Sequence, residues 1–373
     1  MTPQQTNISH EAIMAKVLKK ARQGLGKTTP NPATAACVIK DGQIISWGIH
    51  QKAGTPHAER LAIAAAGPAA KGATLYVNLE PCTHHGRTPP CVDAIIQAGI
   101  AHVIYAAKDP NPKVSANPAD DILKNAGIQV THSVLTTQAE DLNKVFYTNQ
   151  RQNRPYIRLK AAMTLDGKVA LSNGQSKYLT GPESRKKVHQ LRKLTQTILI
   201  GYKTILADDP QLDIRLTATP KSLTTLIIID PKGQAPANAR CFTSNPKAKI
   251  YIVTNSDTQL SQALLKKVTQ WKFNPIDGKL PLDQVLKTAY DAGICDILIE
   301  GGTGIYSSFI QSSLVDEYHL FYAPLIMGGA EDFPVVSIPH SYKVVGDIQR
   351  FQLQEIKRFG EDVYLGVKVP TPN

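Results

Sequence analysis

Two cysteines at the ends of one short polar segment constrain this chain more than any other feature of its sequence. The segment EPCTHHGRTPPC runs from Glu80 to Cys91 and holds two of the five cysteines in the chain. It follows the apolar run ATLYVNL, which predicts a strand, and it precedes CVDAIIQAG, which predicts a helix. Because Pro89 and Pro90 stiffen its end, we expect the segment to loop out and bring both thiols back together.

A second motif gives these thiols a partner. His57, Ala58 and Glu59 open the predicted helix HAERLAIAAAG. One histidine and two cysteines are ligands that zinc prefers, and three ligands leave the open position that marks a catalytic site. We therefore interpret His57, Cys82 and Cys91 as zinc ligands and Glu59 as the catalytic residue that carries protons from an activated water to a leaving amine. The segment between the cysteines would line the pocket with His84, His85 and Arg87.

The spacing departs from the usual zinc deaminase signature, in which H-x-E is followed by P-C-x-x-C. Here Cys91 comes nine residues after Cys82. Scattered cysteines are more often core residues than ligands, but the ordered combination of both motifs at predicted helix starts favours zinc. A closed structural zinc site would need a fourth protein ligand, and no Cys or His has a convincing spacing. The remaining cysteines are expected in apolar core strands: Cys37, Cys241 and Cys295.

Length, charge and hydropathy narrow the class of protein. The chain has 373 residues, more than one ordinary core accommodates, and its net charge of +12 suits an anionic ligand. No long Lys/Arg run is present, which argues against a nucleic-acid partner, although a lysine-rich surface alone explains the charge. The apolar runs are too short to cross a membrane, and the N-terminus lacks a signal-peptide pattern. Few cysteines without a leader predict a cytoplasmic protein with reduced thiols.

Helices and strands alternate along both halves of the chain, so we expect α/β folds. Ser9 is the expected N-cap of the first helix, and Asp41-Gly42 is the expected turn of a hairpin. The polar segment QRQNRPY, residues 150–156, predicts a boundary between domains 1–150 and 151–373. Near the end, DEYHLFYAPLIMG and EDVYLGVKV are expected to be antiparallel edge strands.

The second half has a glycine-rich turn but no G-x-G-x-x-G after an early strand, which argues against a Rossmann domain. In LIEGGTGIYSSFIQ, Leu298 to Gln311, a predicted strand ends at Glu300 and glycines open a helix whose N-terminus suits phosphate. This turn is accompanied by other motifs, namely KAAMTLDGKVA, QSKYLTG, RKKVHQLRK and GYKTILADDPQLDIR.

These motifs, together with HAE, EPCTHHGRTPPC, TTPNP and DPNP, resemble the bifunctional deaminase–reductase family of riboflavin biosynthesis, from about Glu11 to Val369. The resemblance implies an N-terminal cytidine-deaminase-like α/β/α domain and a C-terminal dihydrofolate-reductase-like α/β domain. It implies zinc-dependent hydrolytic deamination of 2,5-diamino-6-(5-phosphoribosylamino)pyrimidin-4-one, then NADPH reduction of the ribosyl to the ribityl side chain. It also implies that Zn²⁺ and NADPH are the cofactors and that the protein is a homo-oligomer.

The resemblance also assigns roles to individual residues. Those implied to contact NADPH are Ala162, Tyr178, Thr204, Asp208, Gly302, Thr303, Gly304, Ile305, Tyr306, Ser307 and Ser308. Those implied to contact the substrate are Asn31 in the first domain and Ser176, Arg192, Leu212, Arg215 and Glu300 in the second. Arg192 and Arg215 suit phosphate because a guanidinium binds it bidentately. Lys160 is a further candidate for a polar group near the reduced carbon.

The chain departs from the family pattern at several positions. Ala35 replaces a glycine of the family. Where the family usually reads HAEVHAL, this chain has Leu61 in place of the second histidine. The segment VSANPADD, after DPNP, lacks the glycines that the family tends to have there. Tyr178 replaces a tryptophan and Asp213 a threonine. Two alternatives therefore stay open, a nucleic-acid deaminase of the tRNA type with an accessory domain, and an enzyme in which only one half is active.

Overall fold

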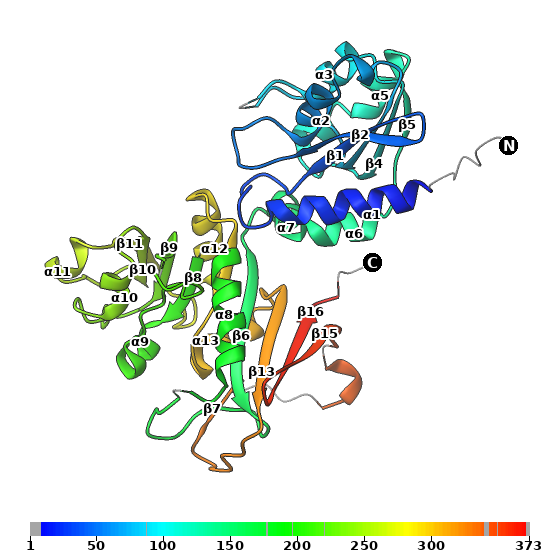
Figure 1. Cartoon of the computed structure of the whole chain (residues 1–373). Helices are drawn as coiled ribbons and strands as arrows, with labels where there is room; N and C mark the ends of the chain where they lie inside the picture. Colours follow the sequence, from blue (N-terminus) through cyan, green and yellow to red (C-terminus); the bar gives the residue numbers. More distant parts are fainter. Residues whose placement is uncertain are drawn as a thin grey trace. The chain divides into compact units, whose positions relative to one another are not determined.

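The chain divides into two compact units, residues 1–153 and 154–373. The computed structural model describes residues 9–370, apart from residues 87, 177, 196, 220, 339–342 and 349. Each unit has its own sheet and its own hydrophobic clusters (Figure 1). In these residues no helix has both the length and the apolar character that crossing a lipid bilayer requires.

The first unit is built on a five-stranded sheet of order β2-β1-β3-β4-β5. Strand β1 pairs antiparallel with both β2 and β3, and the pairs β3–β4 and β4–β5 are parallel. Its elements are α1 (His10–Ala21), η1 (Arg22–Gly24), β1 (Ala35–Lys40), β2 (Gln43–Ile49), α2 (Ala58–Ala66), η2 (Gly67–Ala70), β3 (Thr74–Leu79), α3 (Cys91–Gln97), β4 (His102–Ala107), α4 (Pro112–Ser115), α5 (Ala119–Asn125), β5 (Gln129–Thr131), α6 (Thr136–Leu142) and α7 (Lys144–Gln152).

Helices cover both faces of this sheet, so the unit has three layers. Alternate residues of β1 point to opposite faces, and both faces are buried. Cys37 belongs to the cluster under α1, α6 and α7, whereas Val38 belongs to the cluster under α2, α3 and α5. This is the α/β/α architecture expected from the sequence.

The predicted helix cap at Ser9 and the predicted hairpin turn at Asp41-Gly42 are both confirmed. The hydroxyl of Ser9 accepts a hydrogen bond from the backbone N–H of Ala12 and caps α1. Asp41 and Gly42, with φ angles of 50° and 76°, form the hairpin turn between β1 and β2. Because these residues adopt left-handed conformations at little cost, the dipeptide determines the turn locally.

Helix α2 lies unusually close to strand β2 because of Gly48. A Cβ at Gly48 would lie 2.0 Å from the carbonyl oxygen of Ala58 and 2.6 Å from the backbone nitrogen of Ala62. Both are backbone atoms of α2, so no side-chain rotation relieves the overlap. The absence of a side chain at Gly48 therefore sets the distance of α2, and of the residues at its N-terminus, from the sheet.

The second unit contains a nine-stranded sheet of order β11-β10-β9-β8-β12-β6-β13-β16-β15. Its elements are β6 (Tyr156–Thr164), β7 (Lys168–Ala170), α8 (Pro182–Thr195), β8 (Thr197–Gly201), α9 (Tyr202–Asp208), β9 (Thr225–Ile229), α10 (Arg240–Ser244), β10 (Lys249–Asn255), α11 (Gln262–Leu265), β11 (Thr269–Phe273), α12 (Leu282–Asp291), β12 (Asp296–Ile299), α13 (Thr303–Gln311), β13 (Glu317–Ala323), β14 (Phe333–Pro334), η3 (Val345–Asp347), β15 (Gln352–Phe359) and β16 (Asp362–Lys368).

The strands from β11 to β13 are parallel, and β16 and β15 complete the sheet in antiparallel pairs. The antiparallel pairing of β13 with β16 confirms part of the sequence prediction. Their placement at the edge was wrong, because β13 also pairs with β6 and β16 also pairs with β15. Strand β15 was missed because most of its side chains are exposed and it lacks a clear alternation of apolar and polar residues.

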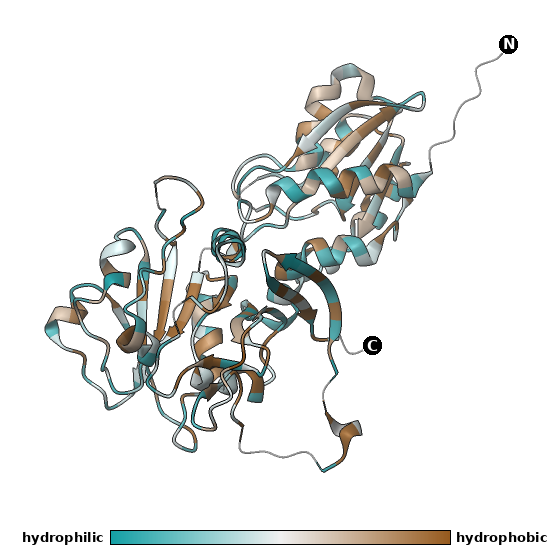
Figure 2. Cartoon of the chain, turned by 60° about the horizontal axis from the view of Figure 1, so that its bottom comes forward, coloured by the Kyte–Doolittle hydropathy of each residue, from teal (hydrophilic) through white to brown (hydrophobic). Residues whose placement is uncertain are grey.

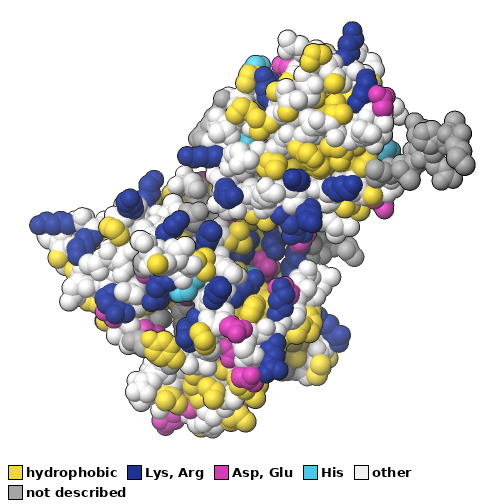
Figure 3. All heavy atoms as spheres, viewed as in Figure 1, with side chains coloured by type: hydrophobic (Ala, Val, Ile, Leu, Met, Phe, Trp, Pro, Cys, Tyr) yellow, Lys and Arg dark blue, Asp and Glu magenta, His cyan; other side chains and the backbone are white. Residues whose placement is uncertain are grey.

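Hydropathy and charge follow this layering. Figure 2 shows hydrophobic strands inside the sheets and more hydrophilic segments on the helices that flank them. On the face seen in Figure 3, Lys and Arg side chains lie among hydrophobic and acidic ones on both units.

All five cysteines are free. Cys37, Cys241 and Cys295 are buried as expected, but Cys241 lies in α10 and Cys295 directly precedes β12.

The close packing at Gly48 makes a testable prediction. Gly48→Ala should destabilise the first unit by roughly 1–3 kcal/mol, because the methyl group must displace α2. We expect a lower midpoint of thermal unfolding and a reduced zinc content, since α2 carries His57 and Glu59. Gly346→Ala, in the second unit, is a control for the addition of one methyl group, because among the described residues its added Cβ meets no atom nearer than 3.9 Å. Equal stability of the two variants would contradict this account of α2.

Candidate active sites

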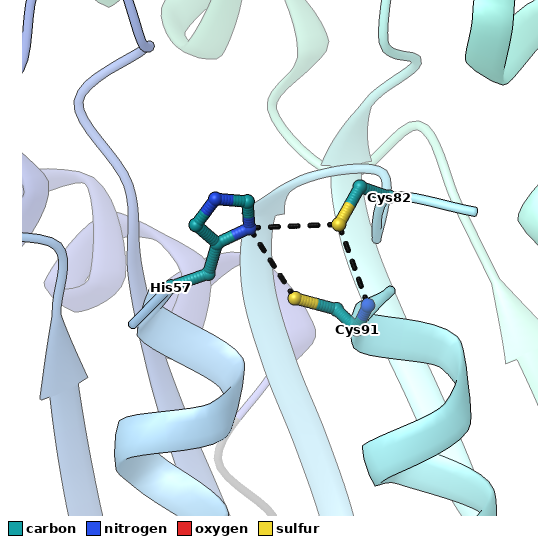
Figure 4. A group of neighbouring side chains, drawn as sticks. All are labelled: His57, Cys82 and Cys91. Carbon is teal, nitrogen blue, oxygen red and sulfur yellow. Dashed lines mark hydrogen bonds between the residues drawn. The ribbon is translucent and has the colours of Figure 1, made fainter. Parts of the chain in front are cut away.

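Three side chains that are distant in sequence meet at one point of the first unit (Figure 4). The Nδ1 atom of His57 lies 3.5 Å from the Sγ atom of Cys82 and 3.4 Å from the Sγ atom of Cys91. Within the described residues, this is the group of His, Cys, Asp and Glu side chains whose ligand atoms converge as a metal site requires, all within 4.8 Å of one another. The structure thus brings together the three residues predicted to bind zinc.

The ends of three elements hold these ligands. His57 is the N-cap residue of α2, Cys82 follows the end of β3, and Cys91 is the first residue of α3. The backbone N–H of Cys91 donates to the carbonyl oxygen of Cys82 at 3.0 Å and to its sulfur at 3.3 Å. The intervening segment therefore loops out and returns, as its prolines predicted.

The geometry fits a tetrahedral zinc ion. Bonds of about 2.0 Å to nitrogen and 2.3 Å to sulfur place the ligand atoms of a tetrahedral site roughly 3.5–3.8 Å apart. The two nitrogen–sulfur distances, 3.4 Å and 3.5 Å, agree with that spacing. Hydrogen bonds from Cys91 and His57 lower the pKa of Cys82 to about 4, so this sulfur becomes the first thiolate. Two thiolates and a neutral imidazole are a zinc donor set.

Glu59 lies next to the ligands without belonging to them. It is on the first turn of α2 and 5% exposed, and the Cys91 side chain is close enough to affect the pKa of its carboxyl group. Burial raises the pKa of Glu59 above the usual value of a glutamate. Glu59 and His57 both line a cavity of about 250 Å³, so a ligand in this cavity can contact the carboxyl group and the metal site together.

The cavity also contains residues from the PNP turn and the DPNP segment. Asn31 lines it, and its Nδ2 atom lies 3.1 Å from Nε2 of His50. Two buried amides, Asn78 and Asn143, hold the backbone of the turn at Ala33. His84 lines the cavity, His85 is not among its lining residues, and Arg87 lies outside the described residues.

Three further residues of this cavity were not singled out from the sequence: His50, Asp109 and Asn111. Burial, partly opposed by a hydrogen bond from the backbone N–H of Asn111, raises the pKa of Asp109 to about 7. The DPNP motif could have identified two of these residues, since it contains both Asp109 and Asn111. No sequence pattern pointed to His50 as a cavity residue, because a lone histidine at the end of a strand is common in cores.

In the second unit, a cavity of about 250 Å³ collects most of the residues predicted to bind NADPH and substrate. Those that line it are Lys160, Ala162, Ser176, Tyr178, Arg192, Thr204, Asp208, Leu212, Arg215, Glu300 and Tyr306. The hydroxyl of Ser176 donates to the carboxylate of Asp208, at 3.0 Å for the nearer oxygen. The cavity therefore joins segments from β6, α8, α9 and the end of β12.

Helix α13 begins beside this cavity at the predicted glycine-rich turn. Gly302 is its N-cap residue, and a Cβ added at Gly302 or Gly304 would meet no atom within 4 Å. The side chains of this turn are used inside the protein: the hydroxyl of Tyr306 donates to the carbonyl oxygen of Lys160, and the hydroxyl of Ser307 accepts from the N–H of Ser337. The open backbone at Gly302 to Gly304 is thus the part that fits a phosphate.

A buried ion pair lines the second cavity. The Nε and Nη2 atoms of Arg192 donate to the two carboxylate oxygens of Glu300 at 2.6 and 2.9 Å, and Nη1 donates to the carbonyl oxygen of Asp213 at 2.8 Å. Burial alone would raise the pKa of Glu300, but the charge of Arg192 lowers it overall. Burial lowers the pKa of Lys160, which Glu300 partly opposes. Glu300 therefore remains ionised, while Lys160 loses its proton more easily than a surface lysine.

Arg215 lies at the rim of the same cavity. Its guanidinium Nε is 3.1 Å from a carboxylate oxygen of Asp213, and its side chain is 51% exposed. Arg185 and His189 of α8 also line the cavity and were not singled out from the sequence. A pattern in the segment RKKVHQLRK could have identified them, because Arg185, His189 and Arg192 recur there at helical spacing and share one face of the helix.

Comparison with known families assigns both units. The family model of the RibD C-terminal domain matches residues 155–365, and the model of the cytidine and deoxycytidylate deaminase zinc-binding region matches residues 7–107. The riboflavin biosynthesis protein RibD of Aquifex aeolicus is 40% identical to this chain over 95% of it and 97% of the relative.

Solved structures that match nearly the whole chain also contain both units in one chain. The RibD structure from Acinetobacter baumannii matches with a TM-score of 0.85 at 33% identity, covering 97% of this chain and 99% of that one. A diaminohydroxyphosphoribosylaminopyrimidine deaminase/5-amino-6-(5-phosphoribosylamino)uracil reductase from Thermotoga maritima matches with a TM-score of 0.83 at 33% identity, covering 96% and 98%.

Proposed function

The chain belongs to the RibD family of riboflavin biosynthesis proteins, and we propose that deamination takes place in residues 1–150 and reduction in residues 151–373. It is a bifunctional enzyme with a zinc-binding deaminase domain of the cytidine-deaminase fold and a dihydrofolate-reductase-like domain that uses NADPH. The convergence of His57 Nδ1 with the sulfurs of Cys82 and Cys91 beside Glu59 supports the placement of the first reaction.

In the first unit we assign the ligand role to His57, Cys82 and Cys91. Zinc bound there supplies Lewis-acid chemistry that makes water nucleophilic near neutral pH. Glu59 accepts a proton from the attacking water and delivers it to the amine that leaves the pyrimidine ring. Asn31 lines the same cavity, where its amide hydrogen-bonds the ring and orients the reacting carbon. The substrate is the diaminopyrimidinone ribosylamino phosphate.

In the second unit the assigned residues hold cofactor and substrate together. NADPH supplies the hydride. The backbone of Gly302 to Gly304 receives a cofactor phosphate, and Ala162, Tyr178, Thr204 and Asp208 surround the rest of the cofactor. The remaining residues of the helix start act through packing and backbone contacts, namely Ile305, Tyr306, Ser307 and Ser308.

The polar groups of the reductase cavity take different roles. Arg215, at the rim, binds the substrate phosphate, and Ser176 and Leu212, which line the same cavity, contact the substrate. Arg192 has three of its donors occupied by Glu300 and Asp213, so its principal role is to hold Glu300 toward the sugar. Since Glu300 stays ionised and the pKa of Lys160 is lowered, Lys160 is the proton donor of the pair.

The two alternative functions are less well supported. A nucleic-acid deaminase with an accessory domain does not account for the match of residues 155–365 to the RibD C-terminal domain. Loss of one activity finds no support in the cavities, since both contain the chemical groups that their reactions need. Ala35, Tyr178 and Asp213 change contacts within these cavities or next to them without removing a zinc ligand or Glu59.

A homodimer formed through the second unit is part of the proposal. Strand β15 is one of the two edge strands of the nine-stranded sheet, and Leu353 and Ile356 on it are 51% and 62% exposed. Ile356 pairs with Leu365 of β16, and Val363, also on β16, is 41% exposed. An exposed apolar edge strand invites pairing, and a second copy of the chain satisfies it symmetrically. The free cysteines suit a reducing compartment, which supports a cytoplasmic location.

The deaminase assignment is tested by Glu59→Gln. Because the amide cannot carry the proton, ammonia release from the diaminopyrimidinone phosphate should fall by at least about 10²-fold. Zinc should remain bound, whereas Cys91→Ser should lose it, as elemental analysis would show. Oxidation of NADPH with the already deaminated substrate should be unchanged in Glu59→Gln, which controls for folding. Normal ammonia release by this variant would refute the mechanism.

The reductase assignment predicts different effects for two substitutions. Lys160→Met should lower kcat for NADPH oxidation by about 10²-fold or more, because the proton donor is lost. Glu300→Gln should mainly raise the substrate KM, since Arg192 keeps a hydrogen bond but loses its counter-charge. Stopped-flow or steady-state absorbance of NADPH separates kcat from KM. Wild-type turnover in both variants would rule out both roles.

The dimer is tested by sedimentation of the intact protein. Ile356→Asp should convert a dimer into a monomer at micromolar concentration, because it places a charge at the centre of the edge strand. Ile276→Asp, at a residue that is 56% exposed away from β15, is the matched control. A wild-type protein that sediments as a monomer would overturn the proposal.

A further inference from the structure

Helix α8 presents a stripe of basic side chains to the reductase cavity. Arg185, His189 and Arg192 are separated by four and three residues, which places them on one face of the helix. All three line the cavity. Arg192 is accounted for by its pairing with Glu300. His189 has no role in the functions assigned so far, although it is near both Arg192 and Arg215, the two arginines predicted to contact the substrate.

The segment that follows α9 needs external support. It carries Leu212 and Arg215, and both Asp209 and Leu212 have positive φ angles, 38° and 53°. An aspartate tolerates this left-handed conformation, but it is unfavourable for a leucine, so neighbouring groups must hold the backbone at Leu212. Asn245 Nδ2 donates to the carbonyl oxygen of Gln211 at 2.8 Å and holds one end.

Helix α8 holds the other end of this segment through two side chains. Arg192 Nη1 donates to the carbonyl oxygen of Asp213 at 2.8 Å, and Nδ1 of His189 accepts a hydrogen bond from the backbone N–H of Arg215 at 3.2 Å. The second contact fixes the backbone of Arg215 itself. The side chain of Arg215 is half exposed, so little packing holds it in place. The backbone contact to His189 therefore limits the region that its guanidinium can reach.

This contact requires a neutral imidazole. A protonated Nδ1 would face the N–H of Arg215 with a second N–H, and no hydrogen bond could form. The charged groups around His189 are Arg192 on its own helix, Arg215 and Asp213 on the segment, and Glu300 after β12. Burial, followed by the two arginines, lowers the pKa of His189 to about 4. At neutral pH the proton of the ring is therefore on Nε2.

We propose that His189 is a positioning residue of the reductase, whose Nδ1 atom holds the backbone of Arg215 so that the guanidinium meets the phosphate of the substrate. This inference rests on the proposed role of Arg215. His189 itself acts through Arg215 and need not touch the reacting atoms. Its loss should therefore weaken binding of a phosphorylated substrate more than it slows the hydride transfer.

Three substitutions test the contact in the intact bifunctional protein. His189→Ala should raise the KM for the deaminated, phosphorylated substrate about three- to tenfold, the effect of one lost hydrogen bond, with kcat changed less than about twofold. His189→Asn should stay near the wild-type KM, because its Oδ1 occupies the position of Nδ1 and accepts the same bond. His189→Gln, whose amide lies one bond further out, should resemble His189→Ala.

Two controls accompany the series. Zinc content and ammonia release by the first unit report the folding and concentration of each variant, since that site lies in the other unit of the same chain. With a dephosphorylated substrate the effect of His189→Ala should disappear, because Arg215 then has no phosphate to meet. An equal effect on both substrates would overturn the proposal, as would a wild-type KM in His189→Ala or rescue by Gln instead of Asn.

Arg215→Gln in the same assay distinguishes the phosphate-binding role of Arg215 from the positioning role of His189. A raised KM in Arg215→Gln with no effect of the His189 substitutions would refute only the positioning role. No effect of Arg215→Gln would refute the phosphate role of Arg215, and the positioning role with it.

Discussion

The meeting of one imidazole nitrogen with two sulfur atoms is the interaction on which the first unit depends. Each of the three groups comes from the end of a different element, so none of them is placed correctly unless α2, β3 and α3 pack correctly on the sheet. Gly48 allows the close approach of α2, and the return of the chain to Cys91 is closed by hydrogen bonds to Cys82. The rigid layers thus set ligand distances that suit tetrahedral zinc, and Glu59 is carried into place by the same helix turn.

The second unit keeps the charged side chains of Arg192 and Glu300 buried in its cavity. A lone buried guanidinium or carboxylate is costly, and Arg192 and Glu300 meet that cost by pairing through two hydrogen bonds. The pair keeps Glu300 ionised, whereas burial, partly opposed by the charge of Glu300, lowers the pKa of the neighbouring Lys160. Proton donation and substrate orientation are therefore divided between neighbouring side chains by their electrostatic surroundings.

Both units place reactive side chains on regular elements and use buried polar groups to hold the loops between them. Asn78 and Asn143 hold the turn that carries Asn31 in the first unit. In the second unit, α8 and Asn245 hold the segment with Leu212 and Arg215. A loop held in this way keeps a substrate contact in position, and in the second unit it does so despite the unfavourable left-handed backbone at Leu212.

The zinc ligands, Glu59, the hairpin at Asp41-Gly42 and the glycine-rich turn before α13 could be predicted from the sequence, because each depends on residue chemistry and short-range spacing. The family motifs extended this to most residues of the reductase cavity. Strand β15 and His50 could not be predicted, since an exposed strand has no periodic pattern and a lone histidine has no diagnostic neighbours. The helical spacing of Arg185, His189 and Arg192 was visible, but only the fold shows that His189 meets the backbone of Arg215. Asp213 shows the same limit: its identity was visible, but only the fold places its carboxylate beside Arg215 and its carbonyl beside Arg192. Sequence by itself determined which chemical groups are available, and tertiary structure decided their partners and protonation, because burial and long-range packing set both.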